Sequence, residues 1–438
     1  MKIKIIALSI IIMSQTVLFA QQVITPEKAI SLALENNYGI KLANTNVSIA
    51  KNNANVLNSG YLPTLVGNSG ATYNVDNTEA EFSNGEVTVL TGAESSRYNA
   101  SVDLNYTIFD GLGRSYNYKR LKETHKLTEL EARETIEQTI LQLFTVYYNV
   151  AQTIENTNNI SETLNISKER LVRAQYQFDY GQNTKLGVLN AEVDINNDSI
   201  NLMNSQQDLK NFKRDLNLVM GNALGDNFSI DTDIAFNNLY SKEALIEKAM
   251  ASNVSLLQVN KNIDINTLNI KSEKSTYLPT LGLTGSYGWN KSNNNAASFL
   301  AVSTNTGLSA GLNLRWDLFD GGSTITRVKN AKINLEAQNI RKEELLVTID
   351  RDFNNAWEDF QNKLNIYKFR EDNITTVKNN FDRTEEKFKL GQVNSIEFRQ
   401  AQINLLNAEL SRNQAKYEAK LAELQMLQVS GSLLDIEF

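Results

Sequence analysis

The sequence predicts an internally duplicated chain that combines very long α-helices with the strands of a membrane β-barrel. Three observations lead to this prediction. The same short motifs occur twice, in the same order, along the 438 residues. Each half contains one very long stretch without glycine or proline. Two pairs of short segments alternate between apolar and polar residues, as half-buried or membrane strands do.

The duplication is visible at the junctions of the chain. The segment Tyr61–Leu65, which reads YLPTL, recurs as Tyr277–Leu281, and the FDG motif at Phe109–Gly111 recurs at Phe319–Gly321. A repeat of about 200 residues is too long for a solenoid and indicates a duplicated domain. The sequence therefore predicts a first repeat at residues 21–222, a connector at 223–240 and a second repeat at 241–438, each repeat running helix, two strands, long helix, helix.

Residues 1–20 have the composition of a cleaved secretory signal peptide. Lys2 and Lys4 precede an apolar run from Ile5 to Ile12, and the small residue Ala20 ends the segment. A retained anchor is the alternative, but the run is shorter than the ~20 residues that span a bilayer. We therefore expect an exported chain, and because it contains no cysteine it has no disulfide framework.

Each half contains one stretch that predicts an exceptionally long helix. Arg114–Tyr180 and Thr324–Leu390 lack glycine and proline, and at 1.5 Å per residue each helix would be roughly 100 Å long. Mostly apolar residues recur there every seven positions, which predicts left-handed wrapping of helices. They are Ile136, Leu143, Val150, Thr157, Leu164, Leu171 and Phe178 in the first copy and Leu346, Phe353, Phe360, Tyr367, Ile374, Phe381 and Phe388 in the second. Helices about half as long, two of which would match one long helix end to end, are expected at Pro26–Ser59, Val188–Met220, Lys242–Thr276 and Ile396–Gln428.

Two pairs of segments predict antiparallel strands. Tyr98–Ile108 and Leu308–Leu318 alternate, and their partners are expected at Leu65–Val75 and Leu281–Trp289. Polar loops are expected within each pair, at Asp76–Ser96 and Asn290–Thr306. Candidate residues for an aromatic girdle at the surface of the lipid bilayer are Tyr73, Tyr287, Trp289 and Trp316. A soluble half-buried sheet alternates in the same way and is the alternative.

Four strands per chain cannot close a barrel in lipid, because an open sheet edge leaves backbone N–H and C=O groups without partners. Known barrels begin at about eight strands. At least two chains must therefore contribute, and a ring with rotational symmetry is the simplest arrangement.

The ordered set of motifs resembles the TolC family of outer-membrane efflux proteins over essentially the whole exported chain. The set includes the YLPTL and FDG junctions and the Gly-Gln turns at Gly181 and Gly391, which are followed by Ala191 and Ala401. The resemblance implies an outer-membrane homotrimer whose 12-stranded barrel, with four strands per chain, is continued by a long α-helical periplasmic barrel. It also implies a passive conduit of a tripartite efflux or type I secretion system, with a periplasmic adaptor (membrane fusion) protein and an inner-membrane pump as partners.

The resemblance further suggests roles for residues near the two Gly-Gln turns. It places Tyr180, Gly181, Gln182, Leu390, Gly391 and Gln392 at periplasmic tips as candidate adaptor-docking residues, and Glu397, Gln400, Gly187 and Asn190 at the periplasmic entrance. From the residues alone, each glycine is expected at a helix–helix turn with a positive φ. Glu397 is the only acidic residue of the entrance set, and we expect it to favour cations. An ordinary exposed helix glutamate is the alternative.

Other polar residues have structural interpretations. Asp110 and Asp320 each precede a long helix, and we expect them to cap its free N–H groups. The only histidine, His125, has no second type of ligand nearby, so neither a metal nor a cofactor is expected.

The charge and motif content exclude several classes of protein. With 43 Lys and Arg against 50 Asp and Glu, the net charge of −7 argues against nucleic acid as a partner. The sequence contains no nucleophile elbow and no nucleotide loop, so we do not expect an enzyme. An exported coiled-coil structural or adhesin-like protein is the alternative function, but it would leave the four strands unexplained.

Overall fold

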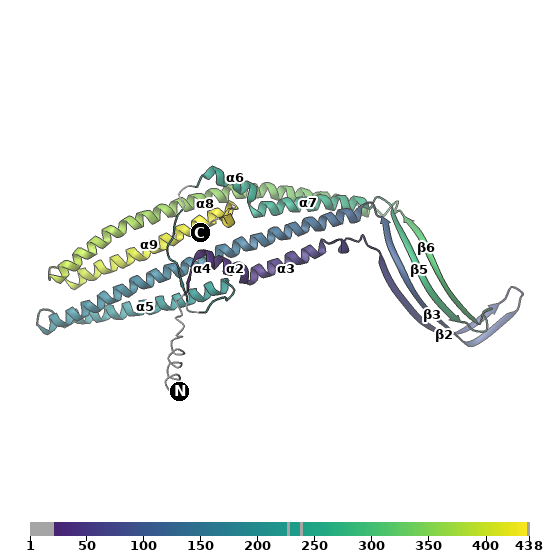
Figure 1. Cartoon of the computed structure of the whole chain (residues 1–438), viewed down its shortest axis with the longest axis horizontal. Coiled ribbons are helices and arrows are strands. Elements are labelled where there is room, and N and C mark those ends of the chain that lie inside the picture. The colour runs from purple at the N-terminus through teal and green to yellow at the C-terminus, as the bar shows by residue number, and fades with distance from the viewer. Residues whose placement is uncertain (1–21, 226–227, 237–239, 436–438) are drawn as a thin grey trace, which may run out of the picture. The chain divides into compact units, whose positions relative to one another are not determined.

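The computed structural model describes residues 22–225, 228–236 and 240–435 (Figure 1). It divides into two compact units. The helical unit comprises the described residues of 1–45, 130–257 and 343–438, and the sheet unit comprises residues 46–129 and 258–342. The predicted signal peptide at residues 1–20 lies outside the described part of the chain.

The elements follow one another in the order of a duplicated chain. The first half contains β1 Gln22–Ile24, α2 Pro26–Asn36, α3 Tyr38–Asn53, the short 3-10 helix Val56–Asn58, β2 Thr64–Glu81, β3 Val87–Phe109, α4 Gly113–Asp179 and α5 Lys185–Val219. The second half contains β4 Phe228–Ile230, α6 Lys242–Ser252, α7 Val254–Ser275, β5 Thr280–Asn293, β6 Val302–Arg315, α8 Ser323–Lys389, α9 Ser395–Val429 and the 3-10 helix Leu433–Asp435.

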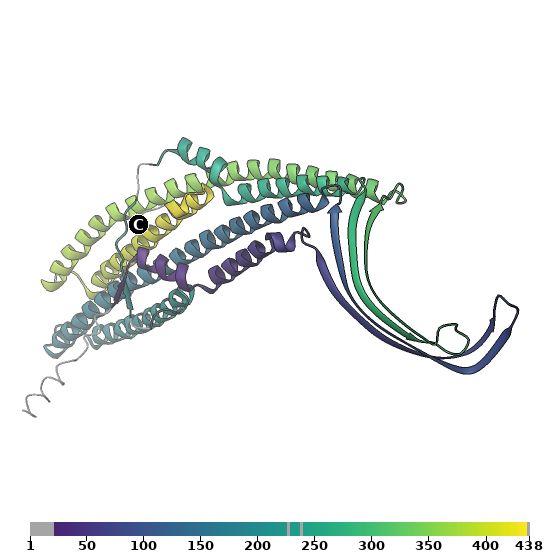
Figure 2. The same cartoon turned by 45° about the vertical axis from the view of Figure 1, so that its right-hand side comes forward.

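The prediction of two uninterrupted long helices is confirmed, since α4 and α8 each contain 67 residues. All the predicted seven-residue positions are buried or half-buried except Phe178, which is exposed at the end of α4. Within the helical unit α8, α9, α4 and α5 lie side by side in that order (Figures 1 and 2). No described helix is both long and apolar enough to cross a membrane.

The main core of the helical unit lies around the middle of α4. Leu143, Phe144 and Val150 are completely buried there, and fully burying such side chains contributes about 1.5–3 kcal/mol each. The hydroxyl of Tyr147 lies 2.8 Å from the carbonyl oxygen of Ile24 and 3.0 Å from that of Asp231. It thereby fixes α4 against β1 and β4, which pair in parallel.

Two predicted helices are each broken in the structure. The helix expected at Pro26–Ser59 divides into α2 and α3 at Asn37, and the helix expected at Lys242–Thr276 divides into α6 and α7 at Asn253. The Asn253 side chain accepts the N–H groups of Ser255 and Leu256 at 3.1 and 3.2 Å, so it caps the start of α7. The prediction of single helices was wrong because asparagine offers the backbone this alternative to a helical hydrogen bond.

The breaks are held by contacts from distant parts of the chain. The amide of Asn37 donates to the carbonyl oxygen of Val219 at 2.8 Å, and that of Asn253 donates to Val429 at 3.1 Å. Gly221 follows the first of these carbonyls with a φ of 77°, and a Cβ there would lie 2.4 Å from the carbonyl oxygen of Asn36. Only glycine fits this close approach. The same arrangement therefore occurs once in each half.

The four long strands form one antiparallel sheet in the order β2-β3-β5-β6. The pairing of β3 with β5 joins the two halves of the chain. Neither β2 nor β6 has a partner on its outer edge within the described chain. The sheet is strongly curved (Figure 2).

The strand boundaries differ from the prediction. Most of the loop expected at Asp76–Ser96 is strand, because β2 continues to Glu81 and β3 begins at Val87. This hairpin extends past the last β3–β5 pair, Ser96 with Asn293 (Figure 2). Conversely β6 ends at Arg315, so Trp316 and Leu318 follow the strand. The alternation of polar and apolar residues gave the core of each strand correctly, but hairpin pairing extends the strand into polar sequence.

Candidate functional sites

The two Gly-Gln turns connect α4 to α5 and α8 to α9 in the helical unit. Gly181 and Gly391 have φ values of 71° and 73°. The next N–H groups, of Gln182 and Gln392, donate to the carbonyls of residues 177 and 387 at 2.7 and 2.8 Å. This is the hydrogen bond that closes a helix end followed by a left-handed glycine, so the expected backbone conformation is confirmed.

The side chains before these glycines are large, apolar and highly exposed. Tyr180 is 77% exposed and Leu390 is 72% exposed. Each lies at the turn that ends a helix hairpin. Both side chains are therefore accessible from solvent in the single chain.

The second hairpin has a complete capping box at the start of α9. The Asn394 side chain accepts the N–H groups of Ile396 and Glu397 at 3.0 and 2.9 Å, and the Glu397 carboxylate accepts the N–H of Asn394 at 3.2 Å. The first hairpin has Thr184 at the corresponding position, without a side-chain capping bond. Glu397 is exposed, but its carboxylate already has this structural role.

A groove of about 630 Å³ lies between the two hairpins. It brings together several predicted residues from both tips: Gln182, Gly187 and Asn190 from the first hairpin, and Gly391 and Gln400 from the second. The other predicted tip and entrance residues, Tyr180, Gly181, Leu390, Gln392 and Glu397, are not among its lining residues.

A largely buried cluster of charged residues, which was not predicted from the sequence, lies at this groove. The Arg399 guanidinium donates to both oxygens of Asp198, at 2.7 and 2.8 Å, and the hydroxyl of Ser167 donates to the same carboxylate at 2.6 Å. Arg170, which is 3% exposed, forms an ion pair with Asp194. The cluster thus joins α4, α5 and α9.

A sequence signal for this cluster exists in α5. Val188 and Ala191 are fully buried, and Asp194 and Asp198 follow at helical spacing on the same face. Two carboxylates on a buried helix face require partners, because an unpaired buried charge is costly. The partners, Arg170 and Arg399, come from other helices and could not be found from spacing within α5.

The four-stranded sheet has one apolar and one polar face. Cross-strand neighbours share a face, and alternation along each strand divides the residues cleanly. The apolar face carries Leu65, Tyr98, Val102, Tyr106, Leu281, Leu283, Tyr287, Trp289, Leu308, Leu312 and Leu314. Most of these side chains are exposed, which is the pattern of a surface that lipid covers.

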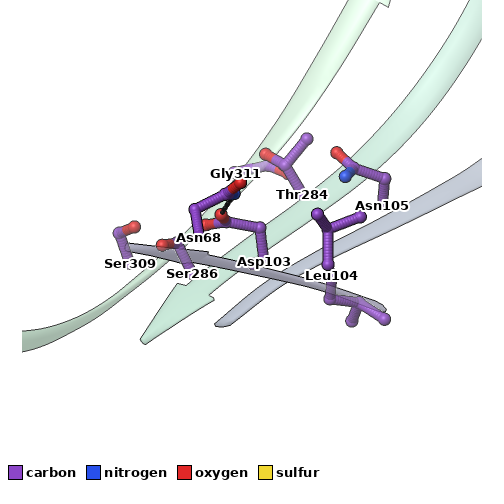
Figure 3. Close-up of a pocket in the computed structure, with 10 residues that line it drawn as sticks. Asn68, Asp103, Leu104, Asn105, Thr284, Ser286, Ser309 and Gly311 are labelled. Atoms are coloured by element: carbon purple, nitrogen blue, oxygen red, sulfur yellow. Dashed lines mark hydrogen bonds between the residues drawn. The ribbon is translucent and has the colours of Figure 1, made fainter. Parts of the chain in front are cut away.

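The polar face is lined by small polar side chains and glycine (Figure 3). Asp103 lies in a shallow hollow of about 360 Å³ with Thr284, Ser286 and Ser309. The Asn68 amide donates to the Asp103 carboxylate at 2.6 Å, and the Ser101 hydroxyl donates to it at 2.9 Å.

The predicted girdle residues fall into two groups. Tyr73, Tyr287 and Trp289 are exposed, and the register places all three on the apolar face. Trp316 lies beyond the end of β6, where its indole N–H donates to the carbonyl oxygen of Tyr277 at 3.1 Å. Its expected position within a strand was wrong, because β6 stops pairing one residue earlier.

The expected capping by the two aspartates is confirmed. Asp110 accepts the N–H of Arg114 at 2.9 Å, and Asp320 accepts the N–H and hydroxyl of Thr324 at 2.8 and 2.6 Å. These hydrogen bonds from Thr324 lower the pKa of the Asp320 carboxyl below its ordinary value. His125 lies 3.6 Å from Glu129, and the described residues contain no group of three potential metal ligands.

The structure combines long paired helices with a curved sheet of four strands that is apolar on one face. This combination is typical of the class of outer-membrane channel proteins. The profile of the family "Outer membrane efflux protein" matches residues 29–222 and 245–432, and the chain belongs to this family. The two matched segments also reflect the duplication of the chain.

Curated relatives align over most of the chain. Outer membrane efflux protein BepC of Brucella suis biovar 1 is 22% identical over 426 residues, which cover 97% of this chain and 89% of the relative. Outer membrane protein TolC of Escherichia coli K12 is 25% identical over 363 residues, which cover 78% of this chain and 71% of the relative.

Solved structures share the fold. The CmeC outer membrane channel of Campylobacter jejuni has a TM-score of 0.78 at 17% identity, over 93% of this chain and 86% of that chain. The open state of the MtrE outer membrane channel of Neisseria gonorrhoeae has a TM-score of 0.71 at 16% identity, over 93% and 89%. The predicted fold class, a membrane β-barrel with an α-helical barrel, is confirmed, as are the outer-membrane location and the efflux-channel function. The alternative of an adhesin-like coiled-coil protein finds no support.

Proposed function

We propose that three copies of this chain form one outer-membrane channel, a passive conduit without enzymatic activity of its own. The observation that carries this proposal is the sheet of four strands whose two edges, β2 and β6, have no partner within the described chain. In lipid such edges must be paired. Pairing β6 of one copy with β2 of the next would satisfy both, and three copies would give the 12 strands of the family.

The substrates of this conduit would be handed over by an inner-membrane pump through a periplasmic adaptor protein. The exposed Tyr180 and Leu390 at the hairpin tips support a docking role for the two Gly-Gln turns. We retain residues 21–222 and 241–438, joined by the connector 223–240, as the proposed repeats.

Disulfide cross-linking tests the closure of the barrel. The chain has no cysteine of its own. Val66 on β2 and Ser309 on β6 lie in the same row of the register, but within one chain they are three strand spacings apart, about 14 Å. A disulfide reaches about 7 Å between Cα atoms. Val66→Cys is therefore combined with a second cysteine, placed in turn at each position along the polar face of β6. We expect at least one of these pairs to form a disulfide between neighbouring copies, which gives covalent trimers, and none to form one within a single chain.

A matched control comes from the same sheet. Asn68→Cys with Ser101→Cys places two cysteines opposite each other within one chain, so it should cross-link within a monomer. The shared barrel would be contradicted if no cysteine position along β6 formed a disulfide between chains and native mass spectrometry gave the mass of a single chain.

Docking at the tips is tested by charge introduction. Leu390→Asp should weaken binding of the organism's periplasmic adaptor protein to detergent-solubilised channels by about tenfold or more, since buried apolar anchors dominate such interfaces. The control is Phe369→Asp, which also changes a highly exposed apolar residue of α8 but lies away from the turn. Equal affinity of both variants would remove the tips from the docking surface.

The entrance role of Glu397 can be separated from its capping role. Glutamine can still complete a capping box, so Glu397→Gln removes the charge while keeping the fold of α9. If Glu397 lines the entrance, single-channel recordings of this variant should show weaker block by divalent cations added on the periplasmic side. Unchanged block would leave Glu397 as a capping residue alone.

A further inference from the structure

The polar face of the sheet contains few charged side chains. In the region where all four strands are paired, the described residues on this face include Arg97 near one end, Asp103 in the middle and Arg315 at the other end. The remaining positions are occupied mainly by threonine, serine, asparagine and glycine. Asp103 is the only acidic residue among them.

The Asp103 carboxylate is held in place by uncharged donors. The Asn68 amide donates to the Oδ2 oxygen (Figure 3). The Ser101 hydroxyl donates to the same oxygen. Its direct neighbours across the strands, Val66 and Ser286, carry no charge either. The carboxylate is therefore oriented on the polar face without a neighbouring cation in its row of the sheet.

The two basic residues on this face lie far from Asp103. Arg97 is six residues away along β3, about 20 Å at the rise of a strand. Arg315 is six residues along β6 from Ser309, which lies in the row of Asp103, and it forms an ion pair with Asp317 at 3.2 Å. Because the Debye length is about 10 Å at 0.1 M salt, each of these charges acts locally.

The apolar face must meet lipid, so the polar face lines the lumen of the barrel. We propose that Asp103 determines the ion preference of this lumen: three copies place three carboxylates at one level, and this ring favours cations over anions. The proposal rests on the proposed trimer, since each copy contributes one carboxylate. Charges of one sign in a narrow aqueous passage concentrate counter-ions there.

Reversal potentials across a planar bilayer test the proposal, with potassium chloride gradients near 0.1 M. Asp103→Asn keeps the shape and the contact to Ser101 but removes the charge. We expect the potassium-to-chloride permeability ratio to fall at least about twofold, and the difference from the wild type to vanish near 1 M, where the Debye length is about 3 Å. Asp103→Asn combined with Asn105→Asp, which restores a carboxylate one row away on the same face, should recover the ratio.

Glu94→Gln is the matched control. It removes one carboxylate from the same strand, but Glu94 belongs to the opposite, apolar face. The inference would be overturned if Asp103→Asn channels still opened and remained trimeric but had the same potassium-to-chloride permeability ratio as the wild type. An equal fall in Glu94→Gln would also overturn it. Failure of the wild-type protein itself to form conducting trimers would instead contradict the proposed function.

Discussion

The buried charged cluster at the hairpin groove gives the most direct energetic prediction. Arg399→Gln leaves the carboxylate of Asp198, which is only 3% exposed, without its cation. Breaking a buried ion pair by removing one partner typically costs 3–5 kcal/mol. Since the Arg399 side chain retains 16% exposure, we expect the lower end of this range, about 3 kcal/mol of unfolding free energy.

The change should be measured by guanidinium unfolding of detergent-solubilised channels, followed by circular dichroism at a helical wavelength. Asp198→Asn together with Arg399→Gln removes both charges and leaves no lone ion, so the double variant should be more stable than Arg399→Gln alone. This coupling between neighbouring sites is what a double-mutant cycle measures.

The control substitution lies on the same helix. Arg412 pairs with Glu371 at 3.5 Å, and these side chains are 27% and 49% exposed, so Arg412→Gln should cost about 1 kcal/mol or less. If Arg399→Gln cost no more than Arg412→Gln, or if the double variant were the least stable of all, the idea of a buried and mutually dependent cluster would fail.

Two further predictions concern the helix break at Asn253 and the half-buried Glu409. Asn253→Ala removes both the cap of α7 and the hydrogen bond to Val429, and should cost about 1–2 kcal/mol in the same unfolding assay; Asn253→Asp, which keeps the cap acceptor, should cost less. Burial and the nearby Glu162 raise the pKa of the Glu409 carboxyl. The folded protein therefore binds a proton at Glu409 more tightly than the unfolded chain does. As a result, the folded state gains stability as the pH falls from neutral toward the raised pKa. Glu409→Gln should therefore have a higher melting temperature than the wild type at pH 7 and a smaller gain on acidification, whereas the exposed Glu418→Gln should follow the wild type. The reasoning would be refuted if lowering the pH from 7 to about 5 did not stabilise the wild type relative to Glu409→Gln.

Periodic patterns in the sequence determined the main elements. The seven-residue spacing from Leu346 to Phe388 defined a helix that the structure contains without a break, because one apolar face must be repeated for helices to pack along their whole length. The alternation of apolar and polar residues around Val102 and Leu312 defined the strands and their lipid-facing side, because successive side chains of a strand point to opposite faces. The repeated motifs gave the duplication and, with it, the family.

Features that depend on contacts between distant residues were decided by the tertiary structure. The breaks at Asn37 and Asn253 each use a carbonyl more than 170 residues away, and no local pattern marks that carbonyl as a partner. The order β2-β3-β5-β6 required knowing that β3 pairs with β5 across the two halves.

The same division applies to the sites. Gly181 and Gly391 could be located from the sequence, because a turn between two helices needs a residue that tolerates positive φ. The Arg399–Asp198 pair could not, because its two members lie on α9 and α5 and meet only when the hairpins pack. Local sequence patterns determine the conformation along a single helix or strand, whereas the pairing of buried charges is decided by which helices lie side by side.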